Sequence, residues 1–424
     1  KGKGQLRRVL RVVEGAVSSE PETSPLENIS ESGTSGEGLT LGKIASGLVQ
    51  RLGSFGLAVI VLLCLMVLTF FGTFAQAHMS LHQVREIYFD SFPGFMLDLG
   101  LFSIPFPSAL VLLSLLFINL LVGGMLRMRR TWSRGGIFVI HIGIAVLLLS
   151  GLVEYASSDK GHMTLYEGQS SSRFASYYDW EVTVTERLPE GRERLYVIPN
   201  DHFAWLEAGD VARFRAEGMP FTVELRGFLA NCRPRRVGGP RDGIEGFGLE
   251  PLQLEMEAEK DIAGLTVTLV DPNGMRREAL LWGAQNAPYR TRIGGRDVAV
   301  DFRHLTWGLP FKVTLRDFQR KLHPRTGMAS SFSSDITRMQ AGVAQDIHIS
   351  MNAPMRHGGF IFYQSGWGPQ NAPPGARLFS TFSVVHNPTD QGPLVACIII
   401  GIGLLWQFLR KLTRHIRAEA GRRA

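Results

Sequence analysis

The sequence has few cysteines, and none stands at the spacing that cysteine chemistry requires. Only Cys64, Cys232 and Cys397 are present, and no CxxC occurs. Two of them lie inside apolar runs, so the polar part of the chain holds one cysteine without a disulfide partner. The scarcity excludes an internal disulfide in that part. The missing CxxC argues against thiol–disulfide exchange and against covalent attachment of haem to this chain.

Motifs of independent catalysts are missing as well. The sequence contains no nucleophile elbow, no P-loop, no HExxH and no GxGxxG after a predicted strand. Aspartates and glutamates are dispersed and form no paired-carboxylate pattern. The histidines of the polar part are scattered without cysteine neighbours: His162, His202, His304, His323, His348, His357 and His386. We therefore expect no independent enzyme.

The positive charge gathers beside apolar runs. The formal net charge is +7, and the mean hydropathy of +0.06 averages very apolar stretches with polar ones. Basic clusters stand in "RMRRTWSRGG", in "RKLTRHIR" and at the extreme N-terminus. This placement is typical of a membrane-orientation signal and argues against nucleic acid as a partner.

Four stretches are long and apolar enough to cross a membrane: 54–75, 104–126, 135–153 and 393–409. The basic flanks fall on one side if the chain runs in–out–in–out–in. We therefore expect a multi-pass protein of the plasma (inner) membrane with both termini cytoplasmic and membrane lipids around it. Because no cleavable signal peptide is visible, we expect the internal apolar segments to direct insertion.

This topology divides the chain into four parts. Residues 1–38, rich in Ser, Glu, Gly and Pro, predict a disordered cytoplasmic segment. Residues 39–153 predict a three-helix transmembrane region with a short external loop at 76–103. Residues 154–391 predict an extracytoplasmic domain, and residues 392–424 predict the fourth transmembrane helix with a basic cytoplasmic tail.

The large external part, residues 154–391, is predicted to consist mostly of β-strands. "WEVTVTERL", "PFTVELRGF", "LQLEMEAE", "LTVTLVDPNG", "RDVAVDF", "PFKVTLRDF", "DIHISMN" and "FSTFSVVHNP" alternate or are rich in β-branched and aromatic residues. Long amphipathic helical patterns between them are absent. The fold class we expect is an integral membrane protein with four transmembrane helices, three N-terminal and one C-terminal, and a large antiparallel β-rich domain.

One histidine lies deep in a predicted span. His141 stands about 9 Å into the third span, at 1.5 Å per residue from Gly135. A buried imidazole needs a partner, which could be a hydrogen bond across helices to Asn119 or Thr69, or the iron of a haem. The glycines of this span allow a flat macrocycle or a neighbouring helix to approach closely: Gly135, Gly136 and Gly143. Since no span holds a second histidine, a bis-His site would need its other ligand from another chain.

Other histidines are weaker candidates. His78 and His82 stand at i and i+4 after the first span and would share a face of a continued helix, but nothing supplies further ligands for a metal. His348 is expected to face solvent, and His357, before a Gly pair, is expected at a turn. We expect no metal site other than one for haem iron.

Several stretches in this order resemble the ResB (CcsB) family of system II cytochrome c biogenesis proteins. They are "FFGTFAQ", "IFVIHIGIAVLLLSGLV", "GHMTLYEGQ", "RDFQRKLHPRTGMASSFSSDI" and "DIHISMNAPMRHGGFIFYQSGWGPQ". The resemblance runs from about residue 52 to about residue 412. One departure is that Ala75 precedes Gln76 where relatives usually carry a proline.

The resemblance implies a subunit that works with a polytopic ResC (CcsA) partner. The pair moves reduced haem b outward, bound non-covalently, and delivers it to the CxxCH motif of apocytochrome c. His141 matches the family's transmembrane haem ligand, with the opposite ligand from the partner, and His357 is the candidate for its external histidine. The chain would then be a non-catalytic or co-catalytic subunit of a cytochrome c haem lyase complex. A haem b electron-transfer subunit and a non-catalytic structural subunit of a membrane respiratory complex stay open as alternatives.

Overall fold

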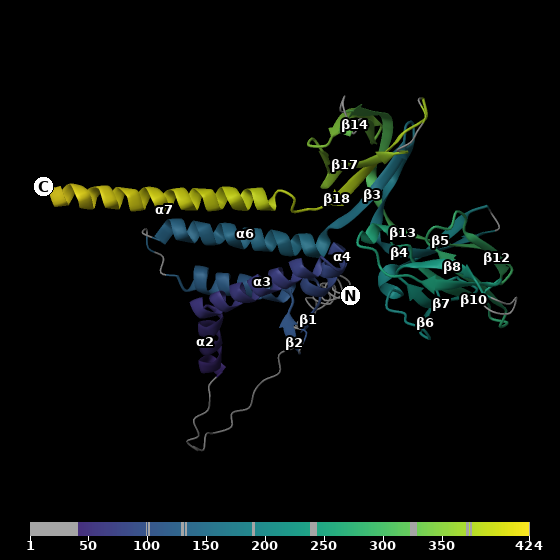
Figure 1. Cartoon of the computed structure of the whole chain (residues 1–424), viewed down its shortest axis with the longest axis horizontal. Helices are drawn as coiled ribbons and strands as arrows, with labels where there is room; N and C mark the ends of the chain where they lie inside the picture. Colours follow the sequence, from purple (N-terminus) through teal and green to yellow (C-terminus); the bar gives the residue numbers. More distant parts are fainter. Residues whose placement is uncertain are drawn as a thin grey trace, which may run out of the picture. The chain divides into compact units, whose positions relative to one another are not determined.

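The computed structural model describes residues 41–423 apart from 99, 101, 129–130, 132–133, 189–190, 238–243, 323–328, 370–372 and 374. The predicted disordered segment 1–38, Arg129 and Arg130 of the basic connector, and His323 lie outside the described residues. The chain forms two units, which are described separately below (Figure 1). One comprises Lys1–Ala77, His82–Ser157 and Pro388–Ala424, and the other His78–Leu81 and Ser158–Asn387.

The first unit is helical. Its elements are α2 (Leu41–Leu52), α3 (Phe55–Ala75), α4 (Leu81–Val84), the π-helix η1 (Arg85–Phe89), β1 (Gly94–Asp98), β2 (Ser103–Pro107), α5 (Ala109–Asn119), the π-helix η2 (Leu120–Leu126), α6 (Gly135–Ser157) and α7 (Gly392–Arg423). Four helical stretches of the described chain are long and apolar enough to cross a membrane: Phe55–Ala75, Ala109–Leu126, Gly135–Ser157 and Gly392–Arg422. The predicted plan of three N-terminal spans and one C-terminal span is confirmed.

The second span begins later than the sequence predicted. Residues 104–107 belong to β2, which pairs with β1 in an antiparallel hairpin, and the helix starts only at Ala109. Pro105 and Pro107 explain the difference, because neither has an N–H group to donate within a helix.

Glycines bring α6 and α7 into close contact. A Cβ on Gly136 would stand 2.8 Å from the carbonyl oxygen of Gly403, and a Cβ on Gly143 would stand 3.0 Å from that of Ala396. Gly135 lies against the ring of Trp406. Small residues at a helix interface let two backbones approach in this way. The start of α6 and the end of α7 therefore lie at the same end of the unit.

The second unit consists of antiparallel strands: β3 (Asp159–Tyr166), β4 (Ser170–Arg187), β5 (Glu193–Pro199), β6 (Val211–Phe214), β7 (Thr222–Leu229), β8 (Cys232–Arg236), β9 (Phe247–Pro251), β10 (Gly264–Val270), β11 (Arg276–Trp282), β12 (Tyr289–Ile293), β13 (Arg296–Leu322), β14 (Ala329–Gln340), β15 (Val343–Ser350), β16 (Met355–His357), β17 (Phe360–Gly368) and β18 (Phe379–His386). A ten-stranded sheet has the order β15-β14-β13-β4-β3-β18-β17-β16, with β12 beside β13 and β5 beside β4. A four-stranded sheet, β11-β10-β7-β6, and the β8–β9 pair complete the described strands. The predicted antiparallel β-rich domain is confirmed.

Two long strands, β4 and β13, pass through two hydrophobic cores. Val182 and Val300 belong to the core that the four-stranded sheet covers. Phe174 and Val313, on the same two strands, belong to a second core with β14 to β18. The β4–β13 register shifts twice between these cores, after His304 and after Gly308. The two halves of the unit are thus parts of one continuous ladder.

Most of the predicted strands are present, with one exception. "LQLEMEAE" is not a strand, because β9 ends at Pro251 and the chain continues in irregular structure to η5 (Ala258–Lys260). Its apolar side chains are exposed instead of facing a core: Leu252, Leu254 and Met256. "DPNG" forms the predicted turn, in which Asp271 accepts hydrogen bonds from the N–H groups of Asn273 and Met275.

The α6–α7 contact predicts a position-dependent effect of larger side chains. Gly143→Leu should destabilise the protein by about 1–3 kcal/mol, because overpacking a close contact forces its neighbours apart. Gly151→Leu on the same helix is the matched control, since nothing lies within 4 Å of a Cβ there. Thermal unfolding of the full chain in detergent measures both. Equal unfolding temperatures for the two variants would contradict close packing at Gly143.

Candidate functional site

The imidazole of His141 is held by its own helix. Its Nδ1 lies 2.7 Å from the carbonyl oxygen of Ile137, one turn earlier in α6. A carbonyl oxygen only accepts hydrogen bonds, so Nδ1 carries the proton and the neutral ring keeps its lone pair on Nε2. The described residues give Nε2 no hydrogen bond. A histidine whose other nitrogen donates to a carbonyl is the usual arrangement of a metal ligand.

The partners predicted for a purely structural His141 are engaged elsewhere. Asn119 donates from Nδ2 to the carbonyl oxygens of Leu52 at 2.6 Å and Ser54 at 2.9 Å. Thr69 donates to carbonyl oxygens of its own helix α3. Among the described residues, the hydrogen bond of His141 is to Ile137 and not to Asn119 or Thr69.

The imidazole lies against the π-helix η2. A Cβ on Gly124 would overlap the His141 ring, and it would stand 3.0 Å from Nε2. A π-helical turn places one extra residue in the helix and often marks a functional site. In this chain η2 brings Gly124 against the histidine, so that backbone without a side chain borders the ring.

The glycine face of α6 is a different face from that of His141. At 100° per residue, His141 lies about 150° around the helix from the stripe that contains Gly136 and Gly143. That stripe is filled by α7. The sequence allowed either a flat macrocycle or a neighbouring helix on the glycine face, and the structure shows the neighbouring helix α7 there.

The paired-histidine face after the first span does not form. Helix α3 ends at Ala75, His78 lies in a turn, and a new helix begins at Leu81, so His78 and His82 are not on one continuous helix. The Nε2 of His82 lies 3.6 Å from a carboxylate oxygen of Glu86. Among the described residues, no group of three or more His, Cys, Asp or Glu side chains could hold a metal ion.

His348 in β15 and His357 at the end of β16 both contact other side chains of the β unit. The exposed His348 binds Asp335 across strands, with 2.8 Å between Nδ1 and the carboxylate. His357 ends β16, at the turn formed by two glycines, and its Nε2 lies 2.7 Å from the amide oxygen of Gln340. Its ring contacts Phe311. Burial, followed by the charge of Arg338, lowers the pKa of His357 below its usual value.

A histidine pair that no local sequence pattern predicts lies on β3 and β13. The ring centroids of His162 and His304 are 6.1 Å apart, and His304 stacks on Trp180 at 3.9 Å. The Nδ1 atoms of both rings are buried without a hydrogen bond. Burial lowers the pKa of His162, and burial together with His162 lowers that of His304 to about 4. The two residues stand 142 positions apart, so only the strand register could have revealed the pair.

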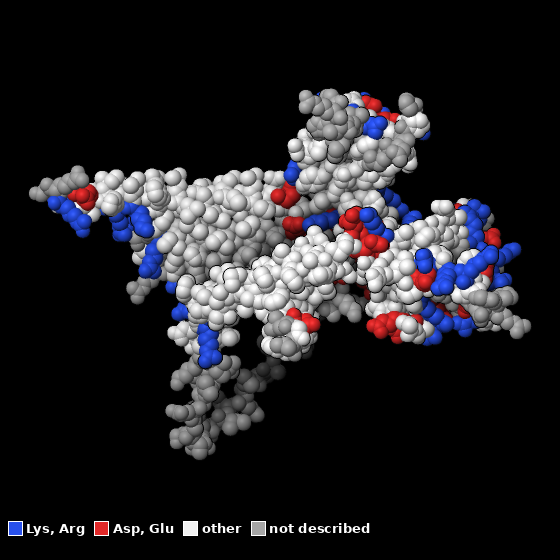
Figure 2. All heavy atoms as spheres, viewed as in Figure 1, with Lys and Arg blue, Asp and Glu red and all other residues white. Residues whose placement is uncertain are grey.

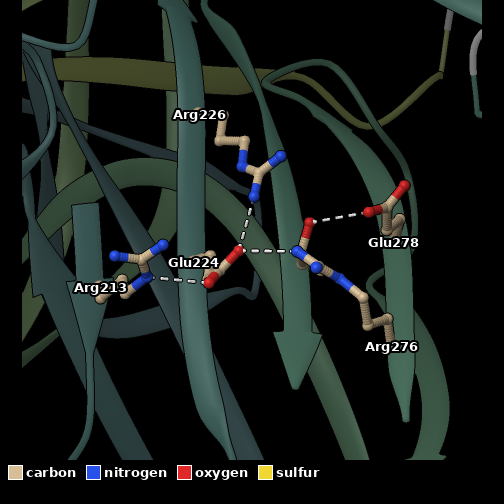
Figure 3. A network of polar contacts seen from close by, with 6 residues as sticks. Arg213, Glu224, Arg226, Arg276 and Glu278 are labelled. Atoms are coloured by element: carbon tan, nitrogen blue, oxygen red, sulfur yellow. Dashed lines mark hydrogen bonds and ion pairs between the residues drawn. The ribbon is translucent and has the colours of Figure 1, made fainter. Parts of the chain in front are cut away.

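A cluster of charges on the four-stranded sheet is structural. Arg213, Arg226 and Arg276, from three strands, all donate to the carboxylate of Glu224 (Figure 3). The hydrogen bond from Arg213 is the largest of the effects that hold the pKa of Glu224 below its usual value. Nearby in the sequence, burial raises the pKa of the Cys232 thiol to about 11, so this cysteine stays protonated and is a poor nucleophile.

Comparisons with known proteins agree with the resemblance seen in the sequence. The model of the ResB-like family matches residues 294–377, which include all of β13 to β17. The chain is also 24% identical over 308 residues to Protein NrfI of Wolinella succinogenes. That alignment covers 72% of this chain and 30% of NrfI, so the chain spans less than a third of that relative. The resemblance to the ResB family is confirmed.

The buried histidine pair predicts an acid-sensitive fold. Because the folded pKa of His304 is below its ordinary 6.5, the unfolded chain binds more protons at mildly acidic pH. The stability should be complete above pH 6.5 and fall as the pH drops towards 4, by up to about 3 kcal/mol. Unfolding followed by tryptophan fluorescence should show this slope in the wild type and a shallower slope in His304→Gln. His348→Gln, at an exposed histidine, is the control, and equal slopes in both variants would contradict the assignment.

Proposed function

Because the resemblance to the ResB family is confirmed, we propose that this chain is the ResB-type subunit of a system II cytochrome c synthase. In this proposal, the chain helps to move reduced haem b across the membrane and to deliver it to the CxxCH motif of apocytochrome c. His141 supplies one axial ligand to the iron of the haem in transit. The chain acts as a co-catalytic subunit, since the sequence offers no catalytic constellation of its own.

The observation that carries the proposal is the state of His141. Its Nδ1–H donates to the Ile137 carbonyl, which fixes the tautomer and the orientation of the ring. The remaining lone pair on Nε2 borders the glycine backbone of η2. A neutral imidazole in an apolar span has little reason to leave a nitrogen without a hydrogen bond unless that nitrogen binds something else.

The second axial ligand has to come from another chain. Haem iron with two protein ligands needs one on each side of the macrocycle, and the apolar parts of the four spans, 55–75, 109–126, 135–157 and 392–409, contain no histidine other than His141. His415 lies in the basic last part of α7, beyond this apolar stretch. A polytopic partner of the ResC (CcsA) type would supply the opposite histidine from one of its helices. His141 is then half of a ligand pair shared between two proteins.

The charges of the helical unit support the orientation that haem export needs. Arg51 precedes α3, Arg127 follows η2, Arg134 precedes α6 and Arg410 lies in the last part of α7. Contacts between Gly53 and Gly123, and between Gly135 and Trp406, place span ends of this kind together. Figure 2 shows a band without charged residues along the helices, with Lys and Arg towards the end of α7. By the positive-inside rule this end is cytoplasmic, which puts both termini in the cytoplasm and His141 in the inner leaflet.

The β unit then lies on the extracytoplasmic side of the plasma membrane, where apocytochrome c is found. We assign to it the binding of the partner or of the apocytochrome. His357 is held by Gln340 and Phe311 at a turn, so in this proposal it positions the β16–β17 hairpin and His141 alone is the haem ligand of this chain.

Haem spectra test the proposal directly. The chain, co-expressed with its polytopic partner, should co-purify with haem. His141→Ala should lower the haem content about tenfold or more, since even outer-shell changes cost about 10- to 100-fold in metal affinity. Added imidazole should restore part of the haem spectrum, because it can occupy the vacated ligand position. His348→Ala, at an exposed histidine of the β unit, should leave the spectrum unchanged.

Two results would contradict the haem-delivery function. Unchanged haem content and holocytochrome c yield in His141→Ala would remove the ligand role and favour a structural subunit. Stable redox cycling of the bound haem with quinol as reductant, without any effect of His141→Ala on holocytochrome c yield, would favour an electron-transfer subunit.

The contact with Gly124 predicts a second effect on the same site. Gly124→Ala should shift the absorption bands of the bound haem or lower its content, because the added Cβ overlaps the His141 ring. Gly56→Ala is the matched control, since nothing lies within 4 Å of its Cβ. Thermal unfolding distinguishes a local shift of the ligand from misfolding. A wild-type haem spectrum in Gly124→Ala would show that η2 does not position the ligand.

A further inference from the structure

A groove lies at the elbow between α2 and α3, away from the partners assigned above. It has a volume of about 490 Å³, and apolar side chains of α2, α3 and α5 line it, with one charged side chain among them: Leu48, Arg51, Leu52, Leu57, Ile60 and Leu115. Helix α2 itself was not predicted from the sequence. Its residues 41, 44, 45, 48 and 52 are apolar and Lys43 and Gln50 lie between them, which is the pattern of a helix that lies in a membrane surface.

The elbow has a fixed shape. The turn at Gly53 packs directly on the backbone of Gly123, because a Cβ on Gly53 would stand 3.0 Å from the Gly123 nitrogen. On either side of this turn, the side chain of Asn119 donates to the carbonyl oxygens of Leu52 and Ser54. Two elements of the second span thus hold the end of α2 against the start of α3, so the groove is built into the fold.

Two guanidinium groups stand at this elbow, and no described residue gives either of them an ion pair with a carboxylate. Arg51 lines the groove, and Arg127 donates from Nη1 to the carbonyl oxygen of Gln50 at 3.1 Å, beside Arg51 in α2. The sequences of α2, α3, α5 and η2 contain no Asp or Glu. Arg51 precedes the start of α3 by four residues and Arg127 directly follows η2. Both charges therefore stand at the ends of apolar spans, at the depth of lipid headgroups.

We propose that this groove binds one anionic phospholipid, with its phosphate on Arg51 and Arg127 and an acyl chain along the apolar wall. Arginine suits this role because its planar donors bind phosphate oxygens in pairs and because it stays charged. The side chains of Leu57, Ile60 and Leu115 form an apolar wall that runs from the arginines along the spans. An acyl chain attached to a phosphate on the arginines would lie along this wall. This site is independent of His141 and of any haem bound there.

Lipid binding to the full-length chain tests the proposal. Native mass spectrometry in detergent, with phosphatidylglycerol and phosphatidylcholine as the added lipids, should show tighter binding of phosphatidylglycerol to the wild type. Arg51→Gln should weaken that binding about fivefold, as expected for one basic residue near the headgroups. Arg51→Lys should retain most of it, and Arg414→Gln, at an exposed arginine of α7, should bind like the wild type.

The groove itself is tested by Ile60→Trp, which should fill it and reduce the binding of both lipids, whereas Arg51→Gln should affect phosphatidylglycerol alone. Thermal unfolding confirms that each variant is folded. Equal phosphatidylglycerol binding by the wild type and Arg51→Gln would overturn the proposal. An equal loss caused by Arg414→Gln would overturn it too, since it would show a general charge effect and no site at the elbow.

Discussion

The interior of a membrane offers polar groups no water, and this constraint explains the positions of the polar side chains in the helical unit. The hydroxyl groups of Thr69 and Ser150 donate hydrogen bonds to carbonyl oxygens of their own helices. Asn119 closes the turn between α2 and α3. His141 obeys the same rule with Nδ1, but an imidazole has two nitrogens and a carbonyl satisfies only one of them. The same constraint that builds the helices therefore leaves one nitrogen available to a ligand.

The β unit depends on a ladder that is longer than either of its cores. Because β4 and β13 run from one core into the other, a change in one half of the unit can alter the pairing in the other half. The buried pair of His162 and His304 lies next to the first register shift, where regular pairing ends. The segment that matches the ResB-like family begins just before β13 and ends after β17, so it contains one strand of the ladder and most of the second core.

The spans and most strands could be predicted because they depend on local patterns, namely twenty apolar residues or strict alternation. The second span was predicted to start at residue 104, five residues before the helix begins at Ala109. The prediction followed the apolar content of this stretch, although Pro105 and Pro107 disfavour a helix there. His141 could be recognised because a single polar residue is conspicuous in an apolar run. Its bond to Ile137 and its contact with Gly124 could not, because they require the side-chain rotamer and the π-helical phase of η2. His162 and His304 meet only through strand register, which no local pattern specifies.

The pairing of β3 with β18 sets Asp159 opposite His386, and these strands follow α6 and precede α7. The outgoing and returning segments of the chain are therefore in contact twice. The strands β3 and β18 pair with each other, and the helices α6 and α7 pack through their glycines. In architectural terms the β unit is an insert whose two ends are neighbours. The contact between α6 and α7 is made by residues outside the β unit, so a change in the length of that unit's loops need not displace the helix that carries His141.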